Sequence, residues 1–377
     1  MRVINGQVFD LERGFVSRDL CTDGRTLSAV SGDETVLDAA GCYVIPGLVD
    51  QHFHGAMGED FSDGSAEGLR KIAEFELSEG VMYICPAGMT ISEEELTRAC
   101  QVAAAHHTAD YPGAEVVGVH LEGPFLCMAK KGAQNAKYLR DPDPAMLHRL
   151  QEAAGGLVKL VTLACEQPGS LDFIRKAREE GVAVSLGHTM ADYDTACAAL
   201  DAGAQQATHL YNAMPPFAHR EPGVIGAIFD HKNACAELIS DGIHIHPAVV
   251  RAAFQMMGAE RMILISDSLR ATGMPDGKYP FGGQEIILKG NRATMADDPS
   301  TLAGSVTSLM GCVRQAHAFG VPLADAVRAA SYNPARTLGI ADRAGSLDVG
   351  KEASFVLLDQ NDLSIRSMVF RGKRIAR

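Results

Sequence analysis

Short apolar runs rich in β-branched residues alternate with helical patterns along the chain from Val44 onward. This alternation is typical of βα units arranged around a parallel sheet. Eight such runs predict the α/β class and a (β/α)8 TIM-like barrel. The predicted strands are Val44–Val49, Val81–Cys85, Val116–Leu121, Val158–Leu163, Val182–Leu186, Gln206–Leu210, Ala236–Ile239 and Met262–Ser266.

Capping signals place helices between these strands. Ser92 and Glu95 have the spacing of a capping box and predict a helix over 92–109. Asp143 precedes a proline, which suits the first turn of a helix. Further helices are predicted over 144–154, over 170–180 with Ser170 as the cap, over 305–319 and over 323–331.

Both ends of the chain read as short strands separated by turns. Residues 1–43 contain weakly alternating runs broken by glycines, and strand-like runs return after about Arg343. We therefore expect 1–43 together with 343–377 to form one small β-sandwich-like domain. It would pack against a metal-dependent hydrolase barrel formed by 44–342.

Composition narrows the function classes. The chain has 377 residues, 46% hydrophobic and 21% charged, which is ordinary for a globular protein. Its net charge of −13 argues against nucleic-acid and anionic-membrane partners but leaves room for a small anionic substrate. The nine cysteines form no C-x-x-C pair, and no apolar run reaches the roughly 18 residues of a membrane span. We expect a reduced, cytoplasmic protein.

Polar residues follow the predicted strands at the end where a barrel carries its active site. His52 and His54 lie two residues apart after the first strand, so one extended segment can direct both imidazoles to one point. Imidazole is a common ligand of divalent transition metals. Further candidates after later strands are Glu122, His188, His209, Asn212, Asp241, His244 and Asp267.

This set is typical of metal-assisted hydrolysis. One glutamate and two histidines hold a divalent cation with an open position, and a further carboxylate moves protons. Asp267 suits the role of that carboxylate. His120 is expected to face the other side of its strand from Glu122 and to have a structural role, and Glu166 receives no role.

These motifs resemble the amidohydrolase superfamily and, within it, the N-acetylglucosamine-6-phosphate deacetylase family. The resemblance covers essentially the whole chain. It implies hydrolysis of the acetamide of N-acetyl-D-glucosamine 6-phosphate to D-glucosamine 6-phosphate and acetate, as a step of amino sugar metabolism. The segments that carry it are His120–Phe125, Lys130–Gly132, Gly187–Thr189, His209–Met214, Arg220–Gly223, Asp241–His244, Ser266–Asp267 and Leu302–Ser305.

The resemblance also implies roles for individual residues. Glu122, His188 and His209 match the main metal ligands, and Asp267 matches the general base and acid. His52 and His54 would allow a second ion, so one or two Zn²⁺ or Fe²⁺ per subunit are expected. Family members are typically dimers in which the arginine at the position of Arg220 reaches the phosphate in the neighbouring active site. The implied substrate contacts are Ala133, Gln134, Asn212, Ala213, Arg220, Asp241, His244, Leu302, Ala303 and Gly304.

Several alternatives stay open. Gln134 stands where the family commonly has a histidine that contacts the sugar, so the galactosamine epimer is a second candidate substrate. Other amidohydrolase reactions are disfavoured, because their usual carboxylated lysine after strand 4 has no counterpart in Leu163–Glu166. A catalytically inactive scaffold is disfavoured because every expected ligand position is filled.

Overall fold

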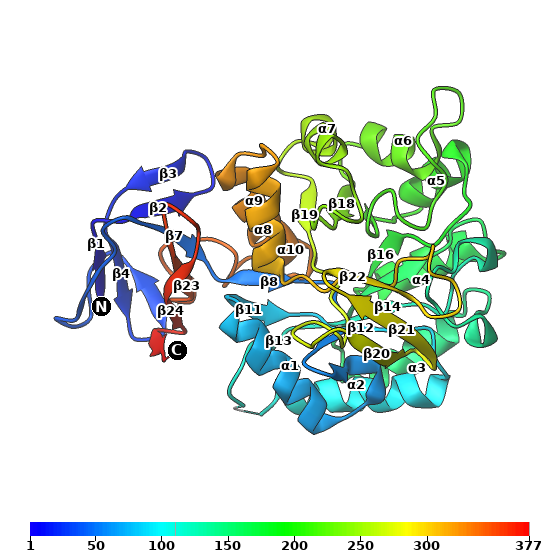
Figure 1. The fold of residues 1–377 in the computed structure, drawn as a ribbon, viewed down its shortest axis with the longest axis horizontal. Helices are drawn as coiled ribbons and strands as arrows, with labels where there is room; N and C mark the ends of the chain where they lie inside the picture. Colours follow the sequence, from blue (N-terminus) through cyan, green and yellow to red (C-terminus); the bar gives the residue numbers. More distant parts are fainter. Residues whose placement is uncertain (110, 377) are drawn as a thin grey trace.

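A parallel (β/α)8 barrel forms the larger part of the computed structural model, which describes residues 1–109 and 111–376 (Figure 1). Neighbouring strands pair in parallel from the first to the eighth. The backbone N–H of Asp267 donates to the carbonyl of His52 at 2.9 Å, which joins the eighth strand segment to the first. The barrel strands are β8 (Leu48–Asp50), β11 (Val81–Ile84) with its continuation β12 (Ala87–Gly88), β14 (Val119–Glu122), β15 (Val158–Leu163), β16 (Ala183–Leu186), β17 (Gln206–Ala207), β18 (Cys235–Leu238) and β19 (Met262–Leu264).

Helices surround the barrel and bury apolar faces against it. The capping box of Ser92 and Glu95 is confirmed, as is the cap of Asp143. Ser170 is not a cap: Gly169 precedes that helix in a left-handed conformation, and the Ser170 hydroxyl donates to the carbonyl of Gln167. The α-helices are α1 (Ala66–Ser78), α2 (Glu93–His107), α3 (Pro144–Ala153), α4 (Ser170–Glu179), α5 (Tyr193–Asp201), α6 (Gly223–Asp230), α7 (Pro247–Met257), α8 (Leu309–Ala318), α9 (Leu323–Ala329) and α10 (Tyr332–Thr337).

Both chain termini lie in a β domain beside the barrel (Figure 1). Its two sheets have the strand orders β5-β4-β1-β6 and β25-β24-β23-β7-β2-β3. Arg377, the last residue of the predicted segment 343–377, lies outside the described residues. The strands are β1 (Arg2–Ile4), β2 (Gln7–Asp10), β3 (Gly14–Ser17), β4 (Leu20–Asp23), β5 (Thr26–Ser28), β6 (Val36–Asp38), β7 (Cys42–Pro46), β23 (Phe355–Asp359), β24 (Ile365–Phe370) and β25 (Lys373–Ile375).

The predicted strand Val44–Val49 is divided between the two sheets. β7 pairs with β2 and β23 in the terminal domain, whereas β8 pairs with β11 in the barrel. Gly47 lies at the division, where a Cβ atom would stand 2.3 Å from the sulfur of Met82. One apolar run therefore serves two sheets, and the barrel begins four residues later than predicted, at Leu48.

An antiparallel sheet that the sequence did not predict follows the eighth barrel strand. It consists of β20 (Gly277–Phe281), β21 (Gln284–Lys289) and β22 (Arg292–Met295), and its bridge between Thr294 and Leu302 leads into the segment 302–304. Small elements complete the described chain: β9 (Gly55–Ala56), β10 (Glu59–Asp60), β13 (Glu115–Val116), and 3-10 turns at Phe61–Asp63, Met128–Lys130 and Ala136–Tyr138. No helix among the described residues has the length and apolar character to span a membrane.

Candidate functional site

Three predicted metal ligands meet at the carboxyl ends of three barrel strands. Glu122 ends β14, His188 follows β16 and His209 follows β17, and all three side chains are buried. Glu122 Oε1 lies 3.2 Å from His188 Nε2 and 3.1 Å from His209 Nε2. The two histidine nitrogens are themselves 3.1 Å apart. The three donor atoms therefore converge as one Glu/His2 group.

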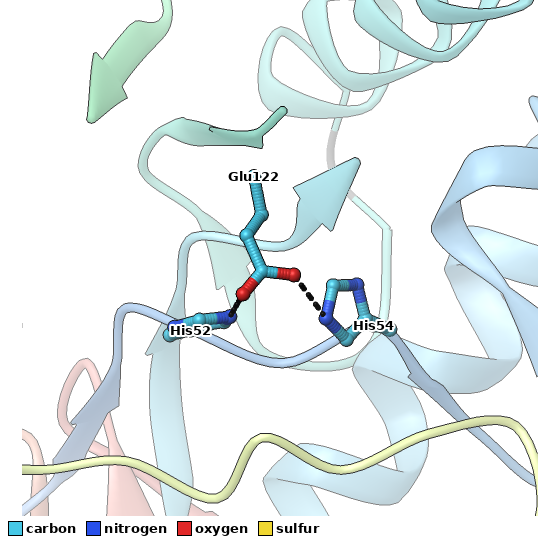
Figure 2. A group of neighbouring side chains, drawn as sticks. All are labelled: His52, His54 and Glu122. Carbon is cyan, nitrogen blue, oxygen red and sulfur yellow. Dashed lines mark ion pairs between the residues drawn. The ribbon is translucent and has the colours of Figure 1, made fainter. Parts of the chain in front are cut away.

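His52 and His54 approach the same carboxylate from the segment after β8. Figure 2 shows the two rings on either side of Glu122, each facing a different carboxylate oxygen. His52 Nε2 is 3.3 Å from Oε1, and His54 Nε2 is 3.2 Å from Oε2. Glu122 Oε1 thus faces His52 as well as His188 and His209, whereas Oε2 faces His54, so four imidazoles meet at one carboxylate.

The hydrogen bonds of two histidines show that the group fits a cation. His188 Nδ1 donates to the carbonyl of Lys130 at 2.8 Å, and His54 Nδ1 donates to the carbonyl of Ala87 at 3.0 Å. Because a carbonyl only accepts, each neutral ring presents the lone pair of Nε2 to Glu122. Lone pairs that face a buried carboxylate need positive charge between them. A divalent metal ion, bound by imidazole and carboxylate, supplies that charge.

The pKa values of the site residues also reflect this need for positive charge. Burial disfavours the charged form of Glu122, but the charge of His52 and hydrogen bonds from His188 and His209 hold its pKa well below the usual range. Burial also disfavours protonation of His54, yet its hydrogen bonds to Asp267 and Glu122 raise its pKa to about 10. The two carboxylates therefore favour a positive charge beside them, which is either a proton on the imidazole or a metal ion in the place of that proton.

Asp267 lies at the edge of this group and lines the open cavity. Its Oδ1 is 3.4 Å from His54 Nε2 and 3.8 Å from His52 Nε2. Burial would raise the pKa of this carboxyl, but the hydrogen bond from His54 and the charge of His52 lower it. An ionised carboxylate in this position can accept a proton from a molecule in the cavity.

Backbone strain is concentrated at these residues. His188, His209 and Asp267 have φ values of +48°, +29° and +48°, in a region that non-glycine residues rarely adopt. Such conformations cost of order 1–3 kcal/mol each and cluster at functional sites. These backbone conformations direct three side chains into one cavity. The packing of the rest of the barrel offsets their energetic cost.

A cavity of about 580 Å³ opens beside the predicted ligands. Three predicted contact residues do not line it. Asp241 instead accepts a hydrogen bond of 2.8 Å from Nδ1 of His244, Ala303 is buried behind the lining, and Arg220 is exposed in the loop between β17 and α6. The predicted contact residues that do line the cavity are Ala133, Gln134, Asn212, Ala213, His244, Leu302 and Gly304.

Gln134 engages both ends of its amide within the protein. Its Nε2 donates to Glu122 Oε2 at 2.5 Å, and its Oε1 accepts from the backbone N–H of Thr90 at 2.7 Å. The side chain is only 2% exposed. In this structure Gln134 therefore orients the central carboxylate, in addition to forming part of the cavity wall.

Two expectations about individual polar residues were wrong. His120 faces the barrel interior as Glu122 does, because residues two apart on a strand share a side. Its ring packs against His52 with centroids 4.5 Å apart, and its Nε2 lies 2.8 Å from the Thr162 hydroxyl. Glu166 has a role: it accepts hydrogen bonds from the Thr189 hydroxyl and the Met190 N–H, which hold the loop after His188.

Glu237 is a site residue that sequence reasoning missed. It lies in β18, its side chain has 0% exposure, and it accepts a hydrogen bond of 2.9 Å from His52 Nδ1. The available signal was a lone carboxylate inside the apolar run 236–239, since an acidic residue is almost never fully buried without partners.

Comparison with known proteins agrees with this geometry. The model of the amidohydrolase family matches residues 43–375. The N-acetylglucosamine-6-phosphate deacetylase of Bacillus subtilis (strain 168) is 39% identical over 87% of this chain and 83% of its own. The N-acetylgalactosamine-6-phosphate deacetylase of Escherichia coli O157:H7 is 37% identical over 87% of this chain and 86% of its own.

Solved structures agree in fold. The crystal structure of N-acetyl-D-glucosamine-6-phosphate deacetylase from Mycobacterium smegmatis superposes with a TM-score of 0.92 at 34% identity, over 100% of both chains. The N-acetylglucosamine-6-phosphate deacetylase from Thermotoga maritima gives a TM-score of 0.90 at 27% identity, again over 100% of both chains. With the barrel, the Glu/His2 group and these matches together, the chain belongs to the amidohydrolase family.

Proposed function

We propose that this protein is a metal-dependent deacetylase that hydrolyses N-acetyl-D-glucosamine 6-phosphate to D-glucosamine 6-phosphate and acetate. The observation that carries the proposal is the convergence of Glu122, His188 and His209 on one point beside Asp267, in a cavity of about 580 Å³. Relatives at 35–39% identity over most of the chain carry the name of this activity.

Glu122, His188 and His209 would hold the ion, which when bound polarises the amide carbonyl and acidifies water. Asp267 then takes the proton of the attacking water molecule, as its ionised form permits. The same carboxyl group returns the proton to the amide nitrogen. The C–N bond breaks, water's oxygen remains in acetate, and the amine of glucosamine 6-phosphate leaves.

His52 and His54 support the proposal of a second ion. Both Nε2 atoms lie within 3.3 Å of a carboxylate oxygen of Glu122. Both histidines come from the one segment that follows β8. We propose Zn²⁺ or Fe²⁺ in both positions, because imidazole and carboxylate together suit these ions. We also infer a cytoplasmic location, since all nine cysteines are free and suit a reducing compartment.

Residues around the cavity supply the proposed sugar contacts. Asn212 and His244 line the cavity with polar groups, and Asp241 orients the His244 ring through Nδ1. Ala133, Ala213 and the segment 302–304 would shape the wall against the sugar ring. The phosphate needs a concentrated cationic partner in a chain of net charge −13, and a guanidinium suits it.

We propose that the protein works as a homodimer and that Arg220 of the partner subunit binds this phosphate. Arg220 of the same chain is exposed and does not line the cavity. An exposed arginine near an interface can complete the site of a second copy, because a two-fold interface exchanges contacts reciprocally.

The galactosamine epimer is the second candidate substrate. One relative at 37% identity is named N-acetylgalactosamine-6-phosphate deacetylase, nearly as similar as those named for glucosamine. The deciding experiment measures kcat/KM for both 6-phosphates on purified protein whose metal content is determined in parallel. Preference for glucosamine supports the first proposal, preference for galactosamine supports the second, and no turnover of either by metal-loaded protein contradicts both.

The same assay tests the metal ligands. His188→Ala and His209→Ala each remove one donor from the Glu/His2 group, so both variants should lose most bound metal and most activity. Elemental analysis that finds full metal occupancy with near-normal turnover in both variants would contradict the ligand assignment. His148→Ala, an exposed histidine on α3, is the matched control and should change neither quantity.

A further inference from the structure

Glu237 is a fully buried carboxylate that no step of the proposed reaction uses. It accepts hydrogen bonds from His52 Nδ1 at 2.9 Å, Gln51 Nε2 at 2.7 Å and Gln206 Nε2 at 3.0 Å. The backbone N–H of His209 donates to it at 3.3 Å. Four donors satisfy an ionised carboxylate, which accepts but does not donate.

We infer that Glu237 is a positioning residue that fixes the tautomer of His52. A proton held on Nδ1 by a carboxylate leaves the lone pair of the neutral ring on Nε2. That nitrogen is the atom directed toward Glu122 Oε1, at 3.3 Å, and toward Asp267 Oδ1, at 3.8 Å. The inference deepens the proposed function, because it takes His52 as a ligand of the second ion.

The orientation of the His52 ring is fixed from a second direction. His120 packs edge-on against it, with centroids 4.5 Å apart and planes at 77°. His120 is itself held through Nε2, 2.8 Å from the Thr162 hydroxyl. A ring held at one nitrogen and along one face cannot readily turn its other nitrogen away from the cavity.

Glu237 and His52 Nδ1 do not bind one metal ion together. Bonds from zinc to nitrogen and oxygen are each about 2.0–2.2 Å, and tetrahedral angles hold the two donor atoms more than 3 Å apart. The observed separation of 2.9 Å is that of a direct N–H···O hydrogen bond. The carboxylate therefore acts through the imidazole.

The first test is Glu237→Gln, which keeps the shape of the side chain. A glutamine amide can donate to Nδ1 and so favour a proton on Nε2, where it blocks metal binding. The second equivalent of Zn²⁺ should bind about 10–100-fold more weakly, the usual effect of losing such a partner, while the Glu122/His188/His209 ion is retained. Gln206→Met is the matched control: it removes one donor to Glu237 but leaves the bond to His52, so the second ion should bind nearly as in wild type.

A double-mutant cycle separates positioning from general structural damage. In a His52→Asn background, Glu237→Gln should cause no further loss of Zn²⁺ affinity, because the imidazole it positions is absent. Equal losses in both backgrounds would overturn the inference, as would an unchanged second-site affinity in Glu237→Gln alone.

Histidine-specific ¹⁵N NMR of the Zn²⁺-loaded wild-type protein gives an answer that depends neither on turnover nor on a Glu237 variant. The signal absent from His52→Asn should show a proton on Nδ1 and none on Nε2. A proton on Nε2 would overturn the inference even if the enzyme deacetylates its substrate. Conversely, lack of deacetylase activity with the expected tautomer would contradict the proposed function while supporting the role of Glu237.

Discussion

Asp267 is the side chain on which the proposed proton transfers depend. It lies beside the metal-ligand group without belonging to the set of Glu122, His188 and His209, and its pKa is lowered, so it is ionised before the reaction. Asp267→Asn should keep the metal, because those three donors remain, while kcat falls by about 10²–10⁴. Steady-state kinetics with metal analysis of the same samples tests this.

The pH profile adds a second criterion for Asp267. The acidic limb of kcat/KM should disappear or move in Asp267→Asn, since protonation of this carboxylate removes the base. Loss of metal in proportion to the loss of activity would instead make Asp267 a ligand. Near-normal kcat with metal retained would remove it from the mechanism.

Glu76 in α1 links pH to stability without a role in the proposed reaction. Its side chain has 0% exposure, and neither carboxylate oxygen has a hydrogen-bond partner among the described residues. Burial, reinforced by Asp50 and Glu79, raises its pKa well above the ordinary value. The folded protein therefore keeps Glu76 protonated at pH values where the unfolded chain, with a pKa of about 4.3, has released the proton.

The sign of this effect follows from proton counting. Above about pH 4.3 the unfolded state binds fewer protons at this position, so stability falls as pH rises toward the folded-state pKa. Glu76→Gln removes the difference in bound protons between the folded and unfolded states. The fall of the free energy of unfolding with pH should therefore become shallower by up to about 1.4 kcal/mol per pH unit. Urea unfolding of both proteins from pH 5 to 8 measures it. Glu74→Gln, on the exposed side of the same helix, should leave the slope unchanged, and an unchanged slope in Glu76→Gln would contradict the account.

At the scale of elements, the hydrophobic pattern predicted the barrel strands well but the strands outside the barrel less well. All eight strands occur where apolar runs were found, because strands buried on both faces need continuous apolar sequence. The pattern failed at Val44–Val49, where an unbroken run passes from one sheet to another at Gly47. It also missed β20–β22, whose half-exposed strands lack the continuous buried run of a barrel strand.

The candidate site was likewise predictable only in part. Residues at strand ends were predictable, since a barrel gathers those ends at one face, and Glu122, His188 and His209 do meet there. Partners that support them were not predictable. Glu237 lies inside a strand, and the contact of Gln134 with Glu122 depends on how a loop folds back over the barrel. Such contacts are set by tertiary packing, which periodicity does not encode.

The β20–β21 hairpin is an element whose contribution to substrate binding can be tested. Its tip carries Phe281, which lines the cavity with its ring 5.9 Å from that of His54 (hairpin in Figure 1). Two side-chain hydrogen bonds join the tip to the loop that carries Gln134: Asn135 Nδ2 donates to the carbonyl of Gly282 at 3.1 Å, and Gln284 Nε2 donates to that of Ala133 at 2.6 Å.

Replacing both Asn135 and Gln284 by alanine should release the hairpin from the loop. Each hydrogen bond contributes about 0.5–1.5 kcal/mol, so KM should rise by about fivefold or more, with a smaller change in kcat. Lys278→Ala is the control, because its exposed ion pair with Glu285 lies on the same sheet. If KM is unchanged in the double variant, the hairpin does not contribute to substrate binding through these contacts.

At the scale of the whole molecule, the cavity lining formed by the described residues of one chain includes no arginine for the proposed phosphate contact. The cavity lining includes Lys130 and Lys131, but Lys131 Nζ is already bonded to the carbonyls of Gly132 and Gln134. Arg220 is exposed away from the lining. A dimer that brings Arg220 of the partner subunit to the cavity would supply a planar, always charged group for phosphate.

Mixed dimers test whether Arg220 acts across the interface. Arg220→Ala and Asp267→Asn should each be nearly inactive as homodimers toward the 6-phosphate. In a mixed dimer, the subunit that keeps Asp267 receives its arginine from the Asp267→Asn partner, so one site is complete. An equal mixture formed by co-expression should therefore recover roughly a quarter of wild-type activity, because half of the dimers are mixed and each has one working site. If Arg220 served its own chain, every site would lack one of the two groups, and the mixture would stay as inactive as its parents.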